Sequence, residues 1–235
     1  MTVHIKEFAE KLSELYKKAK TREEYEEVIG RGTEIETALV GEFPDITAPI
    51  ISPFYWARYY LLLKFPSSKR ERVDFFLEVD QMFSQVKDPD NRVALLYLKS
   101  VILSNLLNDQ RGARWCIIAI SKIISEGKIS IASILRHINA RVIKEMVDKN
   151  WSEAAKISEE IGIFPEDILR QPENLGHAAN VLNNWGASLV RGDIDIVLGR
   201  EKLLIAKDYY LREEVPSEKH LDGIKNRLRE ADEKS

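Results

Sequence analysis

Residues 109–126, DQRGARWCIIAISKIISE, decide the fold class of this chain. Large apolar side chains recur there at spacings of three and four residues, a period that is typical of an α-helix and not of a strand. Because the segment is apolar around most of its circumference, we expect this helix to be flanked on most sides, in the middle of a helical array. Its apolar members are Trp115, Cys116, Ile117, Ile118, Ile120, Ile123 and Ile124, and its narrow polar stripe comprises Arg111, Arg114, Ser121, Lys122 and Ser125.

The same helical period continues on both sides of this segment. Apolar stripes at helical spacing run through residues 5–19 and 25–39, and no proline interrupts residues 90–164. Proline inside a helix costs about 3 kcal/mol, so proline-free stretches of this kind are where long helices form. Sustained alternation with a period of two, which would indicate strands, is missing. The sequence therefore predicts an all-α protein.

A set of capping residues predicts how these helices are organised. Five residues with short polar side chains, which can accept a bond from the first turn of a helix, each precede an amphipathic run. A further helical run stands before each of them, so the sequence predicts five antiparallel helical hairpins with a period of roughly 40–45 residues. The caps are Thr21, Ser68, Asp109, Asn150 and Asp193, and the preceding runs cover residues 2–19, 50–65, 90–107, 130–148 and 174–190.

The ends and breaks of the array follow from composition. Residues 217–231 carry a thin apolar stripe in an otherwise polar helix, as expected of a capping helix at the end of a stack. Residues 41–53, GEFPDITAPIISP, contain three prolines, which should prevent a continuous helix and make this the candidate break. We therefore predict about eleven helices in a single helical-repeat domain over residues 1–235.

Two stretches resemble tetratricopeptide-type repeats. Residues 150–155, NWSEAA, are similar to the start of the second helix of such a repeat, where an aromatic residue precedes a small alanine. Residues 184–186, NWG, are similar to its first-helix glycine. The period here is longer than the family's usual ~34 residues, and Asp193 is followed by Ile-Asp-Ile-Val and not by an aromatic residue and an alanine. The resemblance covers the last half of the chain and implies a tetratricopeptide-like α-solenoid, a fold typical of scaffold proteins.

Composition indicates a soluble protein of the cytoplasm. The 235 residues are 44% hydrophobic, which is enough for a core, and a single cysteine, Cys116, cannot form an internal disulfide. The first residues lack the apolar segment of a signal peptide. The longest apolar run, residues 54–65, is interrupted by Arg58 and Lys64 and is shorter than the ~20 residues of a membrane span. We therefore expect no membrane association.

Charge is unevenly distributed along the chain. Residues 54–149 have 16 basic and 10 acidic side chains, whereas residues 1–53 and 150–235 have net charges of −4 and −5. This basic middle predicts, as an alternative function, an adaptor that binds an anionic partner or nucleic acid, although neighbouring repeats that neutralise one another would give the same pattern. The pI of about 5.9 argues against a dedicated nucleic-acid binder. The candidate anion patch comprises Lys69, Arg70, Arg72, Arg111, Arg114, Arg141 and Lys144.

No motif in the sequence indicates catalysis. The four histidines, His4, His137, His177 and His220, do not pair at the spacing of three or four residues that a helical metal site requires. The 11 glycines are scattered and form no phosphate-binding loop. We therefore predict no catalytic residue, no metal and no cofactor. A helical enzyme without a recognisable motif stays as the third alternative.

Polar side chains on the first helix of each hairpin give the leading functional prediction. In a stack of hairpins the first helices line one concave surface, where Asn and Arg side chains can hold the backbone or a carboxylate of a bound peptide. The alternative is that each residue makes a local cap or a bond between helices. We predict a protein-interaction or scaffold module that binds a peptide or a partner helix through Arg58, Asn105, Arg136, Asn139 and Asn183.

Overall fold

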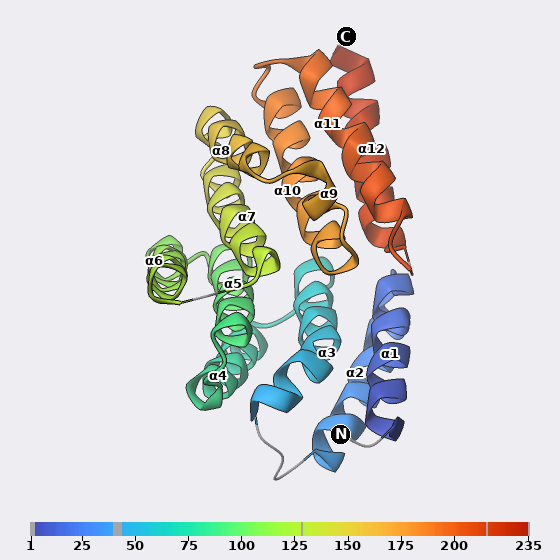
Figure 1. The fold of residues 1–235 in the computed structure, drawn as a ribbon. Coiled ribbons are helices and arrows are strands. Elements are labelled where there is room, and N and C mark those ends of the chain that lie inside the picture. The colour runs from blue at the N-terminus through green and yellow to red at the C-terminus, as the bar shows by residue number, and fades with distance from the viewer. Residues whose placement is uncertain (1–2, 40–43, 128, 215, 235) are drawn as a thin grey trace. The chain divides into compact units, whose positions relative to one another are not determined.

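The computed structural model of the chain describes residues 3–39, 44–127, 129–214 and 216–234. Over these ranges it has twelve α-helices, one short 3-10 helix and no strand (Figure 1). The predicted all-α class is confirmed, and within each compact part of the chain the packing of neighbouring helices is consistent with a solenoid. Among the described helices, none combines the length and the apolar character needed to cross a membrane.

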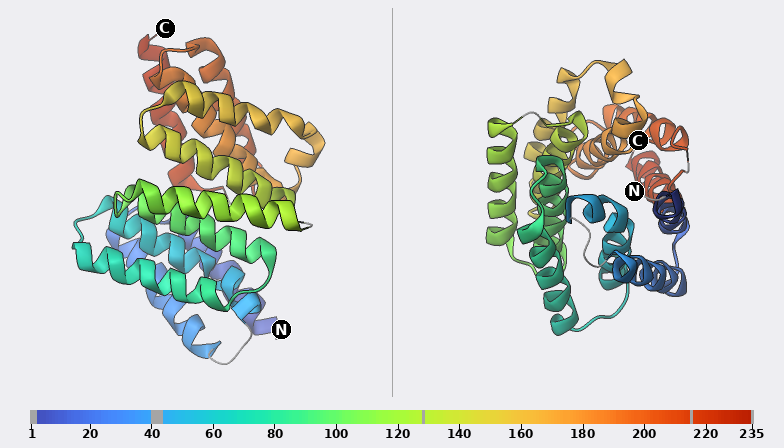
Figure 2. Two further views of the ribbon diagram at one scale, coloured as in Figure 1. Left: turned by 90° about the vertical axis from the view of Figure 1, so that its left-hand side faces the viewer. Right: turned by 60° about the horizontal axis from the view of Figure 1, so that its bottom comes forward.

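The chain divides into two compact units, Met1–Ala113 and Arg114–Ser235. The prediction of one repeat domain over residues 1–235 stays a prediction. In the N-terminal unit, α1 and α2 pack on α3, and α3 packs on α4 and α5 (Figure 2). Its helices are α1 (Val3–Lys18), α2 (Arg22–Ala38), α3 (Pro44–Lys64), α4 (Lys69–Gln85) and α5 (Pro89–Asn105).

In the C-terminal unit, α10 is the central helix. It packs on α7 and α8 and also on α11 and α12. The unit boundary falls inside α6 (Gln110–Glu126). The remaining elements are α7 (Ile131–Val147), α8 (Trp151–Ser158), the 3-10 helix η1 (Glu159–Ile163), α9 (Glu166–Leu169), α10 (Pro172–Arg191), α11 (Ile196–Leu211) and α12 (Glu218–Lys234).

Three of the predicted helix starts are confirmed together with their capping bonds. Thr21 and Ser68 both form capping boxes, in which the hydroxyl accepts a bond from a backbone N–H of the first turn. The glutamate three residues later accepts a bond from the N–H of the cap in return. Asp109 Oδ1 accepts a bond of 2.9 Å from the N–H of Gly112. Each cap of this kind stabilises its helix by about 1 kcal/mol.

The fourth predicted start, Asn150, is confirmed without its capping bond, and the fifth, Asp193, is wrong. Asn150 stands at the N-cap position of α8, but its side chain caps no N–H group. Asp193 is not a cap; it has a φ of 50° in the turn that follows α10. The cap of α11 is Asp195, whose Oδ1 accepts a bond of 2.8 Å from the N–H of Leu198. The turn between α10 and α11 is two residues longer than the sequence pattern indicated. The N-cap of α11 is therefore Asp195 and not Asp193.

The proline-rich segment also differs from the prediction. Residues 40–43 lie outside the described ranges, but α3 begins at Pro44 and continues without a break past Pro53. Pro44 occupies the first position of the helix, where a missing N–H costs nothing. The loss of two further backbone donors inside α3 is offset by the burial of its second half, where Phe54, Tyr55 and Ala57 are at most 3% exposed. The expectation that the prolines prevent a helix is therefore wrong from Pro44 onward.

One segment breaks the regular alternation of hairpins. Between α8 and α10, residues 159–171 form η1 and the one-turn helix α9, which the predicted set of five hairpins and a capping helix does not contain. This insertion raises the helix count from about eleven to twelve α-helices in the described ranges. Ile161 of η1 and Leu169 of α9 are buried in the core of the C-terminal unit, so the insertion is part of the fold.

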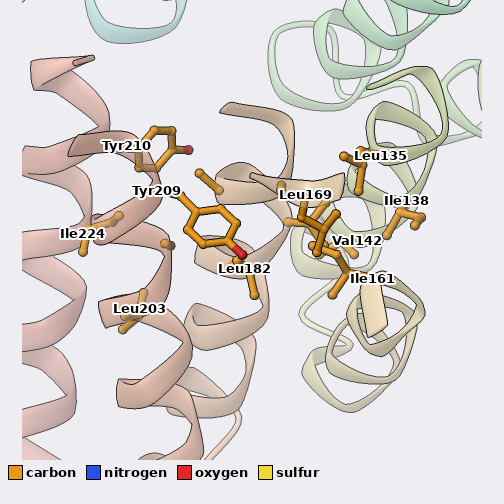
Figure 3. Close-up of a cluster of buried hydrophobic side chains, with 14 of the residues drawn as sticks. Leu135, Ile138, Val142, Ile161, Leu169, Leu182, Leu203, Tyr209, Tyr210 and Ile224 are labelled. Carbon is orange, nitrogen blue, oxygen red and sulfur yellow. The ribbon is translucent and has the colours of Figure 1, made fainter. Parts of the chain in front are cut away.

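The core of the C-terminal unit joins side chains from α7 to α12 (Figure 3). Leu135 and Ile138 of α7, Leu203 of α11 and Ile224 of α12 are at most 2% exposed. Between α10 and α11 two glycines face each other. A Cβ built on Gly186 would lie 2.6 Å from the carbonyl oxygen of Gly199, so the helices approach too closely for any side chain there.

The helix that predicted the fold class is less enclosed than expected. Ala113, Cys116 and Ile120 of α6 are buried, but Trp115 is 70% and Ile118 is 52% exposed. The expectation that α6 is flanked on most sides is therefore wrong. Figure 1 shows α6 end-on at the side of α7, and Ser121 Oγ lies 3.2 Å from His137 Nε2 of that helix. Neighbours cover only one side of α6.

Candidate functional site

Four aromatic side chains lie close together on α1, α3 and α5 of the N-terminal unit. Tyr16 of α1, Trp56 and Tyr60 of α3, and Tyr97 of α5 are all partly exposed, and we call them the aromatic face. Their ring centroids are 6.4 Å apart for Tyr16–Tyr60, 6.4 Å for Trp56–Tyr60 and 5.5 Å for Trp56–Tyr97. Aromatic pairs at such separations stabilise one another beyond the area they bury. The face is therefore a surface of packed aromatic rings with polar hydroxyl groups.

Buried groups support this surface from behind. Tyr25 stacks on Tyr60 with centroids 6.2 Å apart, and Tyr59, which is 4% exposed, accepts a bond of 2.7 Å from Asn105 Nδ2. Burial, and secondly the neighbouring tyrosine hydroxyls, raise the pKa of Tyr16 well above its ordinary value. Tyr16 therefore stays protonated at neutral pH, with a hydroxyl that can both donate and accept a hydrogen bond.

One cation lies at the edge of this cluster. Lys64 Nζ is 5.4 Å from the ring centroid of Tyr25 and 5.7 Å from that of Tyr60. It also donates a bond of 3.3 Å to the hydroxyl of Tyr25. The faces of aromatic rings attract a cation at such distances. The amino group thus adds one positive charge beside the aromatic face.

The two predicted residues of the N-terminal unit have different surroundings. Asn105 holds the buried Tyr59 and so supports the aromatic face. Arg58 instead forms a bidentate ion pair with Glu78, one of whose bonds is 3.1 Å, and its guanidinium lies 5.0 Å from the ring centroid of Phe75. It lines a groove of about 470 Å³ between α2, α3 and α4 together with the carboxylates of Glu71, Asp74 and Glu78.

The C-terminal unit brings a second set of polar side chains together. Asn139 Oδ1 of α7 accepts a bond of 2.8 Å from Asn184 Nδ2 of α10. Arg227 of α12 donates a bond of 3.4 Å to Asn184 Oδ1 and one of 3.3 Å to the carbonyl oxygen of Asn183. These bonds cross three neighbouring helices, and we call Asn139, Asn184 and Arg227 the polar face.

Two further groups continue the polar face. On α10, His177 and Asn180 precede Asn184 by seven and four residues, which places the three side chains on one side of the helix. Burial, and secondly the positive charge of Arg136, hold the pKa of His177 well below its ordinary value, so the ring is neutral at pH 7. Arg136 is partly exposed and donates a bond of 3.3 Å to Ser133 Oγ.

Asn183 differs from the other predicted residues of this unit. Its side chain is only 8% exposed, and its Oδ1 has no hydrogen-bond partner among the described residues. The neighbour that joins Asn139 to Arg227 is Asn184, which sequence reasoning did not select. The spacing from His177 to Asn180 to Asn184 could have identified it. The aromatic face was missed too, although its signal is plain in residues 54–60, FYWARYY.

Some residues of the predicted anion patch form ion pairs or hydrogen bonds within the protein, whereas others are exposed and have no carboxylate partner among the described residues. Arg72 donates bonds to Ser67 Oγ and to the carbonyl oxygen of Leu106. Arg141 pairs with Glu160 and Lys144 with Glu145 and Asp148, at 2.6, 2.6 and 3.1 Å. Arg70 lies 3.7 Å from Asp74. Among the described residues, no carboxylate pairs with Lys69, Arg111 or Arg114, and all three are exposed.

The structure shows how the possible metal ligands and the cysteine of the described part of the chain are placed. No group of three or more His, Cys, Asp or Glu side chains lies close enough there to hold a metal ion. Cys116 is buried. His137 lies against α6, and burial, followed by the charge of Arg141, lowers its pKa to about 4.

The lowered pKa of His137 predicts a pH-dependent stability. Because the folded pKa of about 4 lies below the ordinary value of 6.5, the unfolded chain binds more protons between these values. The contribution of His137 to the free energy of unfolding is therefore complete above pH 6.5 and is lost as the pH falls toward 4. Urea titrations across this range measure it, and His137→Gln should flatten the slope. An unchanged slope in that variant would contradict the assignment.

Comparisons with known proteins give no relative. No protein-family model, no curated protein and no solved structure matches this chain.

Proposed function

We propose that this chain is a protein-interaction module that binds an extended peptide of a partner through the aromatic face. The observation that carries the proposal is the set of four partly exposed Tyr and Trp side chains supplied by three neighbouring helices. Tyr and Trp dominate the binding energy of protein interfaces, because each brings a large contact area at a low cost in conformational entropy.

The chemistry of the aromatic face selects the ligand class. The ring faces of Trp56 and Tyr60 offer apolar contact to aliphatic or proline side chains. A tyrosine hydroxyl can both donate and accept hydrogen bonds, which matches the main-chain carbonyl and N–H groups of an extended peptide. Because the rings already contact one another, little further ordering is needed when a ligand binds.

The polar face adds the same kind of recognition in the C-terminal unit. Asn184 is partly exposed, and its amide has a second N–H and a second acceptor lone pair besides those bonded to Asn139 and Arg227, which itself carries a planar guanidinium. Such groups suit the backbone and the carboxylates of a peptide. The resemblance of residues 150–155 and 184–186 to tetratricopeptide-type repeats is in keeping with a role in protein binding.

Peptide selection tests the proposal. A display library of random peptides is selected on the immobilised full chain, and the affinities of the enriched peptides are measured by calorimetry. We expect Tyr97→Ala to weaken a class of these peptides by about tenfold. Tyr97→Phe, which keeps the ring, should lose only a few-fold. Tyr97 is a suitable position because it lies at the edge of the face and is partly exposed.

A matched control separates binding from folding. Leu77→Ala removes a 55% exposed apolar side chain from α4 of the same unit and should leave peptide affinity unchanged. Circular dichroism of each variant verifies that the helices remain. The proposal is overturned if no enriched peptide distinguishes Tyr97→Ala from the wild type, or if Leu77→Ala weakens binding equally.

A further inference from the structure

A second surface, on the outer side of α6, is independent of the aromatic face. Arg114, Trp115, Ile118 and Lys122 are all exposed, and we call them the α6 outer face. On a helix with 3.6 residues per turn these positions fall within a single stripe of roughly 100°. The buried residues Ala113, Cys116 and Ile120 of the same helix attach it to the protein on other sides.

Packing inside the protein does not explain why a Trp stands at position 115. A side chain of this size that is 70% exposed contributes little to the core, and Ile118, which is 52% exposed, lies one turn further along. Trp and Arg are the residues most enriched among those that dominate interface binding energy. Two large apolar groups in the centre of a charged stripe match the layout of an interface, with an apolar centre and a polar rim.

The charge of the α6 outer face indicates which kind of partner it can bind. Arg114 pairs with no carboxylate of the described residues, and Arg111, in the preceding turn of α6, likewise has none. Lys122 has one acidic neighbour, Glu126, at 3.7 Å on the exposed surface, where such a pair is worth little. The stripe is therefore positive, whereas the chain as a whole has a net charge of −3. The overall negative charge disfavours an anionic membrane or nucleic acid.

We propose that the α6 outer face docks an acidic amphipathic helix of a partner protein. The exposed side chains form a straight ridge along α6, and a partner helix that runs beside it can pack apolar residues on Trp115 and Ile118. Acidic residues on both flanks of that helix would face Arg114 and Lys122. A lipid surface fits less well, because two apolar side chains bury too little area for stable insertion.

Variants of the full chain test this surface. A display library of helix-forming peptides, with acidic, basic and apolar residues randomised, is selected on the immobilised wild type. We expect enriched peptides to be acidic with apolar residues at helical spacing. Trp115→Ser should weaken them by about tenfold or more, and Arg114→Glu should weaken them and reduce the salt dependence of binding. Both positions are exposed, so the variants should fold.

Matched controls and alternative ligands define the outcomes. Val197→Ser, at an 80% exposed position of α11, and Arg229→Glu, on α12, should leave affinity unchanged. Tyr97→Ala should also leave it unchanged, which separates this surface from the aromatic face. The proposal is overturned if no acidic peptide is enriched or if Trp115→Ser binds as the wild type. It is equally overturned if Trp115 is needed instead for binding to phosphatidylserine vesicles or for self-association in sedimentation.

Discussion

Tyr210→Ala is expected to lower the free energy of unfolding of the C-terminal unit by about 4 kcal/mol. The side chain of Tyr210 is 0% exposed. Its ring stacks on His220 with centroids 4.8 Å apart, and Figure 3 shows it beside Tyr209 in the core cluster. Removing the ring loses its burial and leaves a cavity that the packed helices α10, α11 and α12 cannot close. Denaturant titration followed by circular dichroism measures the loss.

Two comparison variants divide this loss into its parts. Tyr210→Phe keeps the ring but removes the hydroxyl that donates a bond of 2.7 Å to Asn180 Oδ1, and should cost about 1–2 kcal/mol. Leu211→Ala changes the next residue of α11, which is 53% exposed, and should cost within about 0.5 kcal/mol. If Tyr210→Ala costs no more than Leu211→Ala, the assignment of Tyr210 to the core is wrong.

The two proposed surfaces differ in how far their side chains are packed before a ligand binds. The aromatic face presents rings that are already ordered by Tyr25, Tyr59 and Asn105, so its ligand meets a preformed surface. The α6 outer face presents a Trp that is exposed by 70% and gains its full burial only with a partner. Peptides selected on the full chain should therefore separate into two classes, one sensitive to Tyr97→Ala and one to Trp115→Ser.

Local features of the fold could be predicted because they depend on neighbours in sequence. The caps Thr21 and Ser68 form because each hydroxyl and its glutamate meet within one turn, whatever surrounds the helix. The pattern failed at Asp193, because Asp195 offers the same carboxylate two residues later and only the length of the turn decides between them. In α3, burial of the second half overrides the helix-breaking tendency of Pro49 and Pro53.

The candidate sites depend on contacts between helices, which the sequence does not encode locally. Asn183 and Asn184 are adjacent, and only the way in which α10 packs between α7 and α12 turns Asn184 toward Asn139 and buries Asn183. In the same way, the period of α6 fixes which residues share a stripe, but not which stripe the neighbours cover. The apolar sequence of α6 therefore led us to expect that Trp115 is buried in the core, but its side chain is exposed.

Gly186→Val is expected to lower the free energy of unfolding of the C-terminal unit by about 3 kcal/mol, the upper range for overpacking a core. The added Cβ would lie 2.6 Å from the carbonyl oxygen of Gly199, which belongs to the backbone of α11 and cannot rotate away. The two helices must therefore move apart along their contact, and Leu203, whose Cγ would lie 2.7 Å from the same Cβ, loses packing.

A glycine in open space provides the control for Gly186→Val. Gly223 lies inside α12, and a Cβ there would meet no atom within 4 Å. Gly223→Ala should therefore raise stability by about 0.5–1 kcal/mol, because alanine favours the helix and restricts the unfolded chain. Thermal and urea unfolding should therefore shift in opposite directions for the two variants. A Gly186→Val protein as stable as the wild type would show that the helices are further apart, and that the glycine pair does not determine how α10 lies between α7 and α12.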